Sequence, residues 1–599
     1  MKPLCGQMLL VTFSIGEKRL LDATKLQGSA FEPLQDERLF NNPVLFHGVI
    51  TWNNGEIDVA SETVYRDSYA YEHDTALLLV KNVRTMFAVV SDYEITGTTG
   101  DITMILGLSK SKYCKGIQCP KTLWMDKYKP EEAEDVLPEA VLENGNKVGD
   151  VARGYFGKYD LVEFDYDKNV MTEKTRQFLK AGSESIAEAA FLVDGLYCAV
   201  DILHKNGSGY DIVEVKSSTG VTDIYIEDMA FQYYVLKRCG INVKRVFLMH
   251  LNNKYVRHGE LDLKKLFTLE EFTEVVKGKY DEVESNIKSI REYVDTVSEP
   301  KRDIDVYCET PYTCAYRGYC AKHIPEQSVF NVRRLNAATK YKYYHQGIIT
   351  FEDIVKQQPK LSDKQWKQVE TAYYDRPDEV DADAIKDFLD TLSYPLYHLD
   401  FETFQQAIPE YDGLSPYAQI PFQYSLHIEQ ADGTLEHREF LAKEGTDPRR
   451  AIAESLCKDF PVNVCVLAYN MSFERGVLQK LAECFPDLSD HLLAIRENIH
   501  DLMVPFQQQQ YYSKAMEGSY SIKYVLPALC PNDPELDYHA LEGVHNGSEA
   551  MEIFADLPNH TPEEIKVMRN NLLKYCCLDT LAMVKVLEKL RKVVAAKQS

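Results

Sequence analysis

Tyr197-Cys-Ala-Val-Asp-Ile-Leu203 and Tyr210-Asp-Ile-Val-Glu-Val-Lys-Ser217 are two runs rich in β-branched and aromatic residues, a composition that predicts two β-strands. Between them lies His204-Lys-Asn-Gly-Ser-Gly209, a segment typical of a hairpin turn. We therefore expect an antiparallel hairpin that is symmetric about Gly207 and Ser208.

This hairpin brings charged side chains together. In the symmetric register Asp201 lies opposite Glu214, and the two-residue period of a strand puts Glu214 and Lys216 on one face. Carboxylates hold Mg²⁺ or Mn²⁺, the metal lowers the pKa of a bound water, and a lysine steadies charge on the nucleophile or phosphate. The pattern predicts a site for phosphodiester hydrolysis, although by spacing alone a solvated face with an ordinary Glu–Lys pair is the commoner explanation.

The hairpin and the following helix-like segment resemble a known nuclease class. Asp201 and Glu214-Val-Lys216, followed by Asp228-Met-Ala-Phe-Gln232, are similar to the PD-(D/E)XK nuclease superfamily in its RecB-like branch. The resemblance implies that Asp201 and Glu214 bind the metal and that Lys216 is the catalytic lysine. It also implies that Gln232 lies on a helix beside the site.

The sequence departs from that family at two places. The tyrosine expected four positions after the glutamine is Leu236. The upstream metal-binding histidine is missing near Gly145–Arg153, where Asp150, or a residue on an expected helix carrying Glu184 and Glu188, would have to replace it.

Clustered cysteines predict a metal centre. Cys308, Cys314 and Cys320 are each separated by five residues, and Cys119 is the natural fourth ligand, with Cys114 in reserve. Four thiolates can hold a 4Fe–4S cluster or Zn²⁺, and this spacing favours neither strongly. Four unliganded thiols are the remaining alternative.

The order of these cysteines along the chain resembles the iron–sulfur staple of AddB-type and CRISPR-associated RecB-like exonucleases. One cysteine precedes the nuclease-like segment and three follow it. The resemblance implies a structural 4Fe–4S cluster rather than zinc, and the ligation energy would contribute to folding.

A second set of acidic residues lies toward the C-terminus. Tyr394-Pro-Leu-Tyr-His-Leu-Asp400-Phe-Glu402-Thr-Phe404 predicts a strand with both acids on one face, and Val464–Ala468 predicts another strand that runs into Asn470-Met-Ser-Phe473-Glu474. Tyr575-Cys-Cys-Leu-Asp579 lies in a segment whose apolar residues have a helical period. The i,i+4 spacing puts Tyr575 and Asp579 on one face of the predicted helix. We expect that helix to run from about Glu563 to Val594.

This ordered set resembles the DnaQ-like exonucleases of the RNase H-like fold, in the variant with tyrosine in the third motif. The resemblance implies that two Mg²⁺ or Mn²⁺ ions are bound by four carboxylates, those of Asp400, Glu402, Glu474 and Asp579. It implies that Tyr575 orients the attacking water. Glu474 stands where the family usually has aspartate. Its longer side chain moves the carboxylate by roughly 1 Å, and the geometry of a two-metal site is sensitive to a shift of this size.

The chain divides into stretches that predict a multidomain α/β protein. At 599 residues it is too long for one core. We expect a small β-rich module over 1–70, a connector over 71–103, a RecB-like PD-(D/E)XK unit with a restriction-endonuclease-like core over 104–325, a helical bridge over 326–393 and an RNase H-like exonuclease unit over 394–599. Residues 1–70 resemble a small bacterial β-rich module of unknown function. Residues 104–596 resemble an uncharacterised bacterial family that fuses the two nuclease types.

Composition limits the function. Hydrophobic residues make up 45% of the chain without a 20-residue apolar run, so we expect no membrane segment, and no signal peptide is evident. These features predict a cytoplasmic protein. The net charge of −25 argues against a protein that coats nucleic acid but permits a nuclease with a local basic groove.

These observations lead to one main hypothesis and two alternatives. We expect a metal-dependent nuclease, an exonuclease that acts on DNA in preference to RNA; because no phosphate-binding Gly-x-x-x-x-Gly-Lys-Ser/Thr loop is present, any helicase would be a separate partner. The first alternative is a nucleic-acid-binding or scaffold protein with inactive sites. The second is a zinc-dependent regulatory protein.

Overall fold

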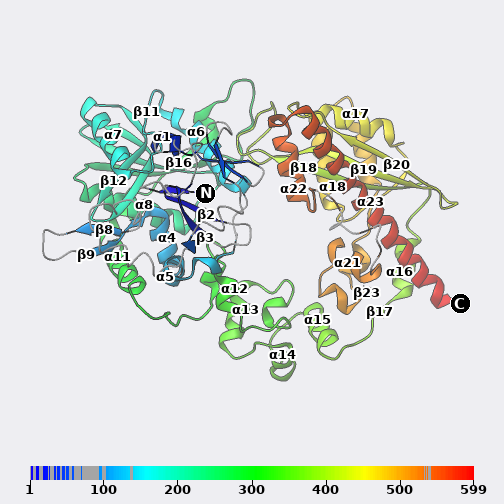
Figure 1. Cartoon of the computed structure of the whole chain (residues 1–599). Coiled ribbons are helices and arrows are strands. Elements are labelled where there is room, and N and C mark those ends of the chain that lie inside the picture. Colours follow the sequence, from blue (N-terminus) through cyan, green and yellow to red (C-terminus); the bar gives the residue numbers. More distant parts are fainter. Residues whose placement is uncertain are drawn as a thin grey trace.

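The structure is a computed structural model of the whole chain (Figure 1). It describes residues 103–134, 139–531 and 543–598, with residues 533, 536 and 541. Before residue 103 it describes only short pieces, namely residues 2–4, 8–12, 18–23, 26, 31, 33–34, 37–40, 43–46, 49–52, 57–59, 69–70 and 93–96. The expected multidomain α/β class is confirmed, because several separate sheets are each packed with helices.

The hairpin forms as expected from the sequence. Strands β13 (Leu196–Asn206) and β14 (Gly209–Lys216) are antiparallel, with Leu203 opposite Ile212 and Asn206 opposite Gly209. Gly207 and Ser208 therefore form the two-residue turn, and Gly207 supplies the positive φ of 57° that such turns require. The register that brings Asp201 beside Glu214 is confirmed.

The hairpin is the centre of the first α/β unit. Its sheet has the order β11-β12-β13-β14-β15-β16, and β10 pairs with the free part of β13. The bounds are β10 Leu108–Ser109, β11 Asp160–Leu161, β12 Ser185–Val193, β15 Val243–Leu251 and β16 Phe267–Glu271. The β14–β15 pair is parallel, and α8 (Asp223–Arg238) provides the crossover.

Helices bury both faces of this sheet. On one face α8 packs with α4 (Lys110–Gln118) and α11 (Tyr280–Val294), and the rings of Tyr113 and Phe231 stack with centroids 4.8 Å apart. On the other face α6 (Glu139–Ala152) contributes Val148 to a smaller core. The segment with Glu188 is strand β12, so the expected helix there is wrong; the helix of this region is α7 (Lys168–Ala181), which ends at Gly182 in the left-handed conformation.

The second α/β unit has a mixed sheet of order β20-β19-β18-β21-β22. Its strands are β18 Leu396–Gln405, β19 Gln419–Glu429, β20 Leu435–Leu441, β21 Cys465–Ala468 and β22 Ile499–Asp501. Helices α17 (Arg449–Asp459), α18 (Ser472–Cys484) and α19 (Ser489–Glu497) cover one face. The other face carries α16 (Ala382–Leu389), α21 (Ile522–Leu529) and α23 (Pro562–Gln598), and α22 (Gly547–Asp556) packs against β18.

Short helices connect the two units. They are α12 (Arg317–Ala321), α13 (Ala337–His345), α14 (Phe351–Gln357) and α15 (Asp363–Tyr373), which lie at the bottom of Figure 1 between the two sheets. The start of α15 has a capping box, in which Ser362 accepts from Gln365 N and the Gln365 side chain accepts from Ser362 N. The sequence Leu361-Ser-Asp-Lys-Gln-Trp366 predicts such a capped helix start, and the structure confirms it.

The two units also meet at a second place, after β18. The hydroxyl of Tyr417 donates to the carbonyl of Ser217 at 2.7 Å, and the Arg257 guanidinium donates to Pro409 O at 2.8 Å. Ala407 is buried in the core beneath α6. The loop over residues 406–418 is therefore docked on the first unit.

The described N-terminal pieces are mostly strands. One sheet has the order β1-β2-β3-β7 and another β4-β5-β6, with bounds β1 Lys2–Leu4, β2 Met8–Thr12, β3 Lys18–Asp22, β4 Val44–Phe46, β5 Val49–Trp52, β6 Ile57–Val59 and β7 Tyr69–Ala70. The sequence Asn53-Asn54-Gly55 predicts a turn; this turn and most of the connector expected over 71–103 lie outside the described residues. In the part of the chain that is described, helices fall short of the length and apolar character needed to cross a membrane.

Gly209 is a position where backbone segments approach closely beneath the hairpin. A Cβ at Gly209 would lie 2.2 Å from the carbonyl oxygen of Asn242, which already accepts from Tyr210 N. We expect Gly209→Ala to separate β14 from β15 and to lower the free energy of unfolding by about 1–3 kcal/mol, measured by urea denaturation. Gly220→Ala, where a Cβ would meet nothing within 4 Å, is the control, and an equal loss in both variants would contradict the explanation.

Candidate functional sites

The first carboxylate cluster lies where the hairpin meets α8. Asp201 Oδ2 accepts from Val215 N at 2.7 Å, which fixes the Asp201 carboxylate against β14. Glu214 is 1% exposed, and Gln232 Nε2 donates to its Oε2 at 2.6 Å. The structure thus brings together Asp201, Glu214 and Gln232, which the sequence pattern had singled out.

Lys216 also belongs to this cluster, and it contacts Asp228, an acid to which the sequence analysis had assigned no role. Its Nζ lies 2.5 Å from Glu214 Oε1 and 2.7 Å from Asp228 Oδ2. Asp228 is also held by Gln232 Nε2 at 3.0 Å, one helical turn along α8. The i,i+4 spacing of Asp228 and Gln232 was the available signal, because it puts both side chains on the face toward the sheet.

Lys110 is the second residue that the sequence analysis missed. It is the first residue of α4, and its Nζ lies 3.0 Å from Glu214 Oε1 and 3.5 Å from Asp201 Oδ1. Spacing could not reveal this contact, because 91 residues separate Lys110 from Asp201. The ammonium group lies between the two carboxylates, the position that a divalent cation bound by both would take.

The two lysines set the charge of this cluster. Burial alone would raise the pKa of Glu214, and the Asp201 carboxylate adds to that, but Lys110 and Lys216 outweigh both and hold the pKa below its ordinary value. Burial opposes the charged form of Lys216, yet its acidic neighbours raise its pKa. The donor set of two carboxylates suits Mg²⁺ or Mn²⁺, but a metal would have to displace Lys110.

The departures from the family pattern have structural counterparts. Arg153 Nη1 lies 2.7 Å from Asp150 Oδ1, and its Nη2 lies 3.1 Å from Glu188 Oε1, so both candidate replacements for the histidine are paired with a guanidinium. Leu236 is fully buried in the core beneath the sheet. A leucine there provides packing in place of a hydroxyl.

The second carboxylate cluster lies between β18 and α23. Asp400 and Glu402 come from one face of β18, and Asp579 comes from the facing turn of α23. Carboxylate oxygens of these three residues all lie within 4.8 Å of one another. The resemblance had grouped these residues, and the structure brings them together.

Glu474 lies close to this set but outside its tightest part. It is in the first turn of α18, is 2% exposed, and its Oε2 has no hydrogen-bond partner among the described residues. Asp501 supports the preceding loop, because its Oδ1 accepts from Asn470 N at 3.0 Å and from Met503 N at 2.9 Å. The buried, unpaired oxygen of Glu474 is a position at which a cation would be stabilising.

These carboxylates repel one another in a buried environment. Burial first, and then the charge of Asp579, raise the pKa of Glu402 to about 8 and the pKa of Asp400 well above its ordinary value. Burial, followed by Asp501 and Glu402, raises the pKa of Glu474 to about 8. Lys523, at the start of α21, is the cation that partly offsets this effect at Glu402. Such a set fits divalent cations, which oxygen ligands of this kind prefer.

Tyr575 lies one turn before Asp579 on α23. Its ring is 4% exposed, and burial, reinforced by Asp579, raises the pKa of its hydroxyl far above the usual range. The phenol therefore stays protonated at neutral pH. A protonated hydroxyl beside a carboxylate cluster can hold a water molecule in a fixed orientation.

The four expected cysteines line one small cavity with three basic side chains, and the set is Cys119, Cys308, Cys314, Cys320, Lys121, Arg302 and Arg317. Gln118 Nε2 donates to the carbonyls of Tyr307 at 2.7 Å and Tyr312 at 2.6 Å, which ties the segment before Cys119 to the cysteine-rich loop. The donor set fits a thiolate-bound metal centre, and the basic side chains would offset its negative charge.

Replacing Lys110 tests its role as the resident cation of the first cluster. In an Asp400→Asn background, which weakens the second cluster, we expect Lys110→Met to strengthen Mn²⁺ binding by at least about tenfold, because the competing ammonium is gone. Mn²⁺ titration monitored by electron paramagnetic resonance measures the change. Lys115→Met, on the exposed side of α4, is the control, and unchanged binding in Lys110→Met would contradict the prediction.

The raised pKa values predict how stability depends on pH. Between the unfolded pKa of about 4.5 and the folded pKa of about 8, the folded protein holds more protons at Glu402 and Glu474, so stability falls as the pH rises. We expect the unfolding temperature in EDTA to fall from pH 5 to pH 8, and Mg²⁺ to restore it most at pH 8. Asp400→Asn should flatten this dependence and exposed Asp490→Asn should not; a metal-free protein that gains stability over this range would refute the explanation.

Comparison with known families gives a partial match. Residues 397–521 match the model of the family described as "Domain of unknown function (DUF2779)". The match includes Asp400, Glu402 and Glu474 and ends before Tyr575 and Asp579. A comparison with curated proteins found none that matches the chain. Over this segment the chain is therefore similar to an uncharacterised family, as the sequence analysis expected in part.

Proposed function

We propose that the protein is a metal-dependent nuclease that hydrolyses phosphodiester bonds, with its principal site at the second cluster. The observation that carries the proposal is the convergence of Asp400, Glu402 and Asp579, whose carboxylate oxygens lie within 4.8 Å of one another. Glu402 is buried and Asp400 and Asp579 are partly buried, and bringing three such acids together is costly without a cation, so the arrangement is best explained by metal binding. The second unit would then be a DnaQ-like exonuclease of the RNase H-like type.

The residues of this site have separate tasks in the proposed reaction. Asp400, Glu402 and Asp579 would hold Mg²⁺ or Mn²⁺, and the ion would supply activation of water and charge compensation at the phosphate. Glu474 supplies a further carboxylate from α18. Tyr575 would keep its proton and orient the attacking water. As the water oxygen bonds to phosphorus, the bond to the leaving oxygen breaks; the water gives up one proton, and the leaving oxygen takes up one proton from solvent. The buried surroundings strengthen each of these electrostatic contacts.

The first cluster supports a second nuclease site of the RecB-like PD-(D/E)XK type. Asp201 and Glu214 would hold the metal, Lys216 would face the phosphate, and Gln232 would fix the Glu214 carboxylate through the contact at 2.6 Å. Lys110 distinguishes this site from the second one, because its ammonium lies beside both acids and offsets part of their charge.

The alternative function, a nucleic-acid-binding or scaffold protein with an inactive site, is favoured by one observation at the first cluster only. There Lys110 occupies the position of a cation, and Arg153 pairs with both Asp150 and Glu188. The second cluster has a different charge balance, because its acids act on one another and Lys523 offsets charge at Glu402. We therefore assign the activity to the second cluster and leave binding of nucleic acid as the minimal role of the first.

The four cysteines are proposed to hold a structural 4Fe–4S cluster, with zinc as the alternative. Cys119 and the three later cysteines come from opposite ends of the first unit, and the cavity that they line would fasten these ends together. Binding would release protons, because burial raises the pKa of the Cys308 thiol to about 11 in the metal-free protein.

The substrate is proposed to be DNA in preference to RNA, and any helicase would be a separate partner. Basic groups near the second unit support contact with phosphates, since Arg333, Arg334 and Lys364 line one pocket on the bridge side of that unit. The free thiols of the cysteine-rich centre support the proposed cytoplasmic location.

The direct test is cleavage of end-labelled single- and double-stranded DNA and RNA by protein purified without oxygen, with Mn²⁺, Mg²⁺ or EDTA. Because Asp400 holds the metal, Asp400→Asn should lose at least about a hundredfold in rate, more than the loss of an outer-shell partner. Lys216→Ala reports on the first cluster alone. Exposed Asp490→Asn should retain wild-type cleavage. Absence of metal-dependent cleavage by folded wild-type protein, with iron and sulfide present, would favour the scaffold alternative.

A further inference from the structure

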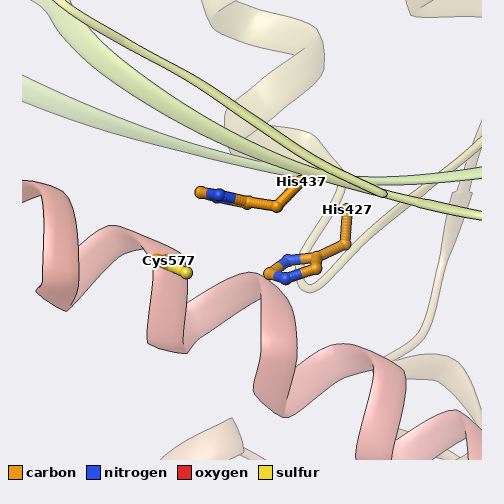
Figure 2. A group of neighbouring side chains, drawn as sticks. All are labelled: His427, His437 and Cys577. Atoms are coloured by element: carbon orange, nitrogen blue, oxygen red, sulfur yellow. The ribbon is translucent and has the colours of Figure 1, made fainter. Parts of the chain in front are cut away.

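A group of two histidines and a cysteine lies on the second unit, away from the carboxylates. His427 on β19 is directly opposite His437 on β20, and Cys577 comes from α23, which packs over these strands. Figure 2 shows both imidazole rings pointing from the strands toward the helix turn that carries Cys577. Three side chains from three separate elements therefore meet in the layer between sheet and helix.

The spacing of these side chains fits a metal ion. One nitrogen of each imidazole and the Cys577 sulfur all lie within 4.8 Å of one another. The two rings are 4.6 Å apart between centroids and inclined by 35°. A tetrahedral zinc ion with bonds of ~2.0–2.3 Å separates its ligand atoms by roughly 3.3–3.8 Å. A contraction of about 1 Å, within the reach of small side-chain rotations, would close the site.

Hydroxyl groups already hold the rings in the way that metal sites require. His427 Nδ1 lies 2.8 Å from Thr580 Oγ1, and His437 Nε2 lies 3.0 Å from Ser425 Oγ. The two hydroxyls are themselves 2.7 Å apart, and Thr580 donates to the carbonyl of Cys577. These contacts use one nitrogen of each ring, and the proposed site would use the other nitrogen of each ring.

The electrostatic surroundings also suit a cation. Burial, and then His437, lower the pKa of His427 to about 4, so the ring is neutral and its lone pair is available at pH 7. Glu439, which pairs with Ser425 two residues along β20 from His437, is the nearby carboxylate, and its charge acts on both His437 and Cys577. A divalent ion would be balanced by one thiolate and this carboxylate.

We propose that His427, His437 and Cys577 form a separate zinc site, with the fourth position open to solvent beside Glu439. Nitrogen and sulfur ligands select Zn²⁺ over Mg²⁺, which the oxygen-only clusters take. Cys577 lies two residues from both Tyr575 and Asp579 on α23, so the ion would fasten that helix to β19 and β20. The site does not depend on the proposed nuclease activity.

Zinc content of the full-length protein tests this site. The protein is purified without oxygen, dialysed with Zn²⁺ in excess Mg²⁺ so that the carboxylate clusters are filled, and assayed for zinc per chain. We expect wild type and Cys484→Ala, which removes an exposed cysteine of the same unit, to retain one equivalent more than Cys577→Ala and His437→Ala. Metal at the four-cysteine cavity is common to all four proteins and cancels in the comparison.

Cobalt provides a second readout that activity does not influence. The spectrum of Co²⁺-loaded wild type minus that of Co²⁺-loaded His437→Ala should contain a thiolate-to-metal band, and Zn²⁺ should raise the unfolding temperature of wild type but not of this variant. His437 is exposed, so its replacement should preserve the fold, and circular dichroism verifies this. Equal zinc content in the four proteins, or a featureless difference spectrum from folded proteins, would overturn the proposal.

Discussion

Repulsion between buried carboxylates is the constraint on which the second unit depends. The carboxylate oxygens of Asp400 and Glu402 on β18 and of Asp579 on α23 lie within 4.8 Å of one another, although burial and mutual charge raise the pKa values of the first two. Apolar packing on both faces of the sheet supplies the stabilisation that offsets this repulsion. The long helix α23, the strand order and the short supporting helices can be understood as the framework that keeps these acids together.

The two acidic clusters differ in how the repulsion between their carboxylates is offset. At the first cluster Lys110 and Lys216 lie within 3.0 Å of Glu214, and the pKa of that acid is held below its ordinary value. At the second cluster Lys523 is the nearby cation, and the pKa values of the acids stay high. An internal ammonium makes the first cluster stable without metal, whereas the second gains most from an added ion. Carboxylates in the two clusters therefore differ in how much an added cation would stabilise them.

Local sequence patterns predicted the local structure well. The hairpin register, the capped start of α15 and the helix carrying Asp579 follow from turn residues, capping side chains and helical spacing, all of which act within a few residues. The strand at Glu188 was mistaken for a helix, because its apolar run is buried on both faces and has no two-residue alternation. Short apolar runs of this kind do not distinguish strand from helix.

Contacts between distant segments were beyond such patterns. Lys110 reaches Asp201 across 91 residues, and His437 meets Cys577 only because α23 crosses β20. Neither pairing has a fixed spacing that the sequence could reveal, since each depends on how whole elements pack. Spacing alone could not group Asp579 with Asp400, because the two residues are far apart in the sequence. The family resemblance grouped them.

The docked loop after β18 has a mechanical consequence. The chain leaves the first unit through α12–α15, enters the second, and at Tyr417 returns to bond Ser217, the residue after Lys216. The helices and the docked loop therefore connect the two units at two places, one covalent and one hydrogen-bonded. Two connections restrict rotation of one unit relative to the other more than the helices alone would. The two acidic clusters are therefore held at a nearly constant separation by two connections, where a single linker would let that separation vary.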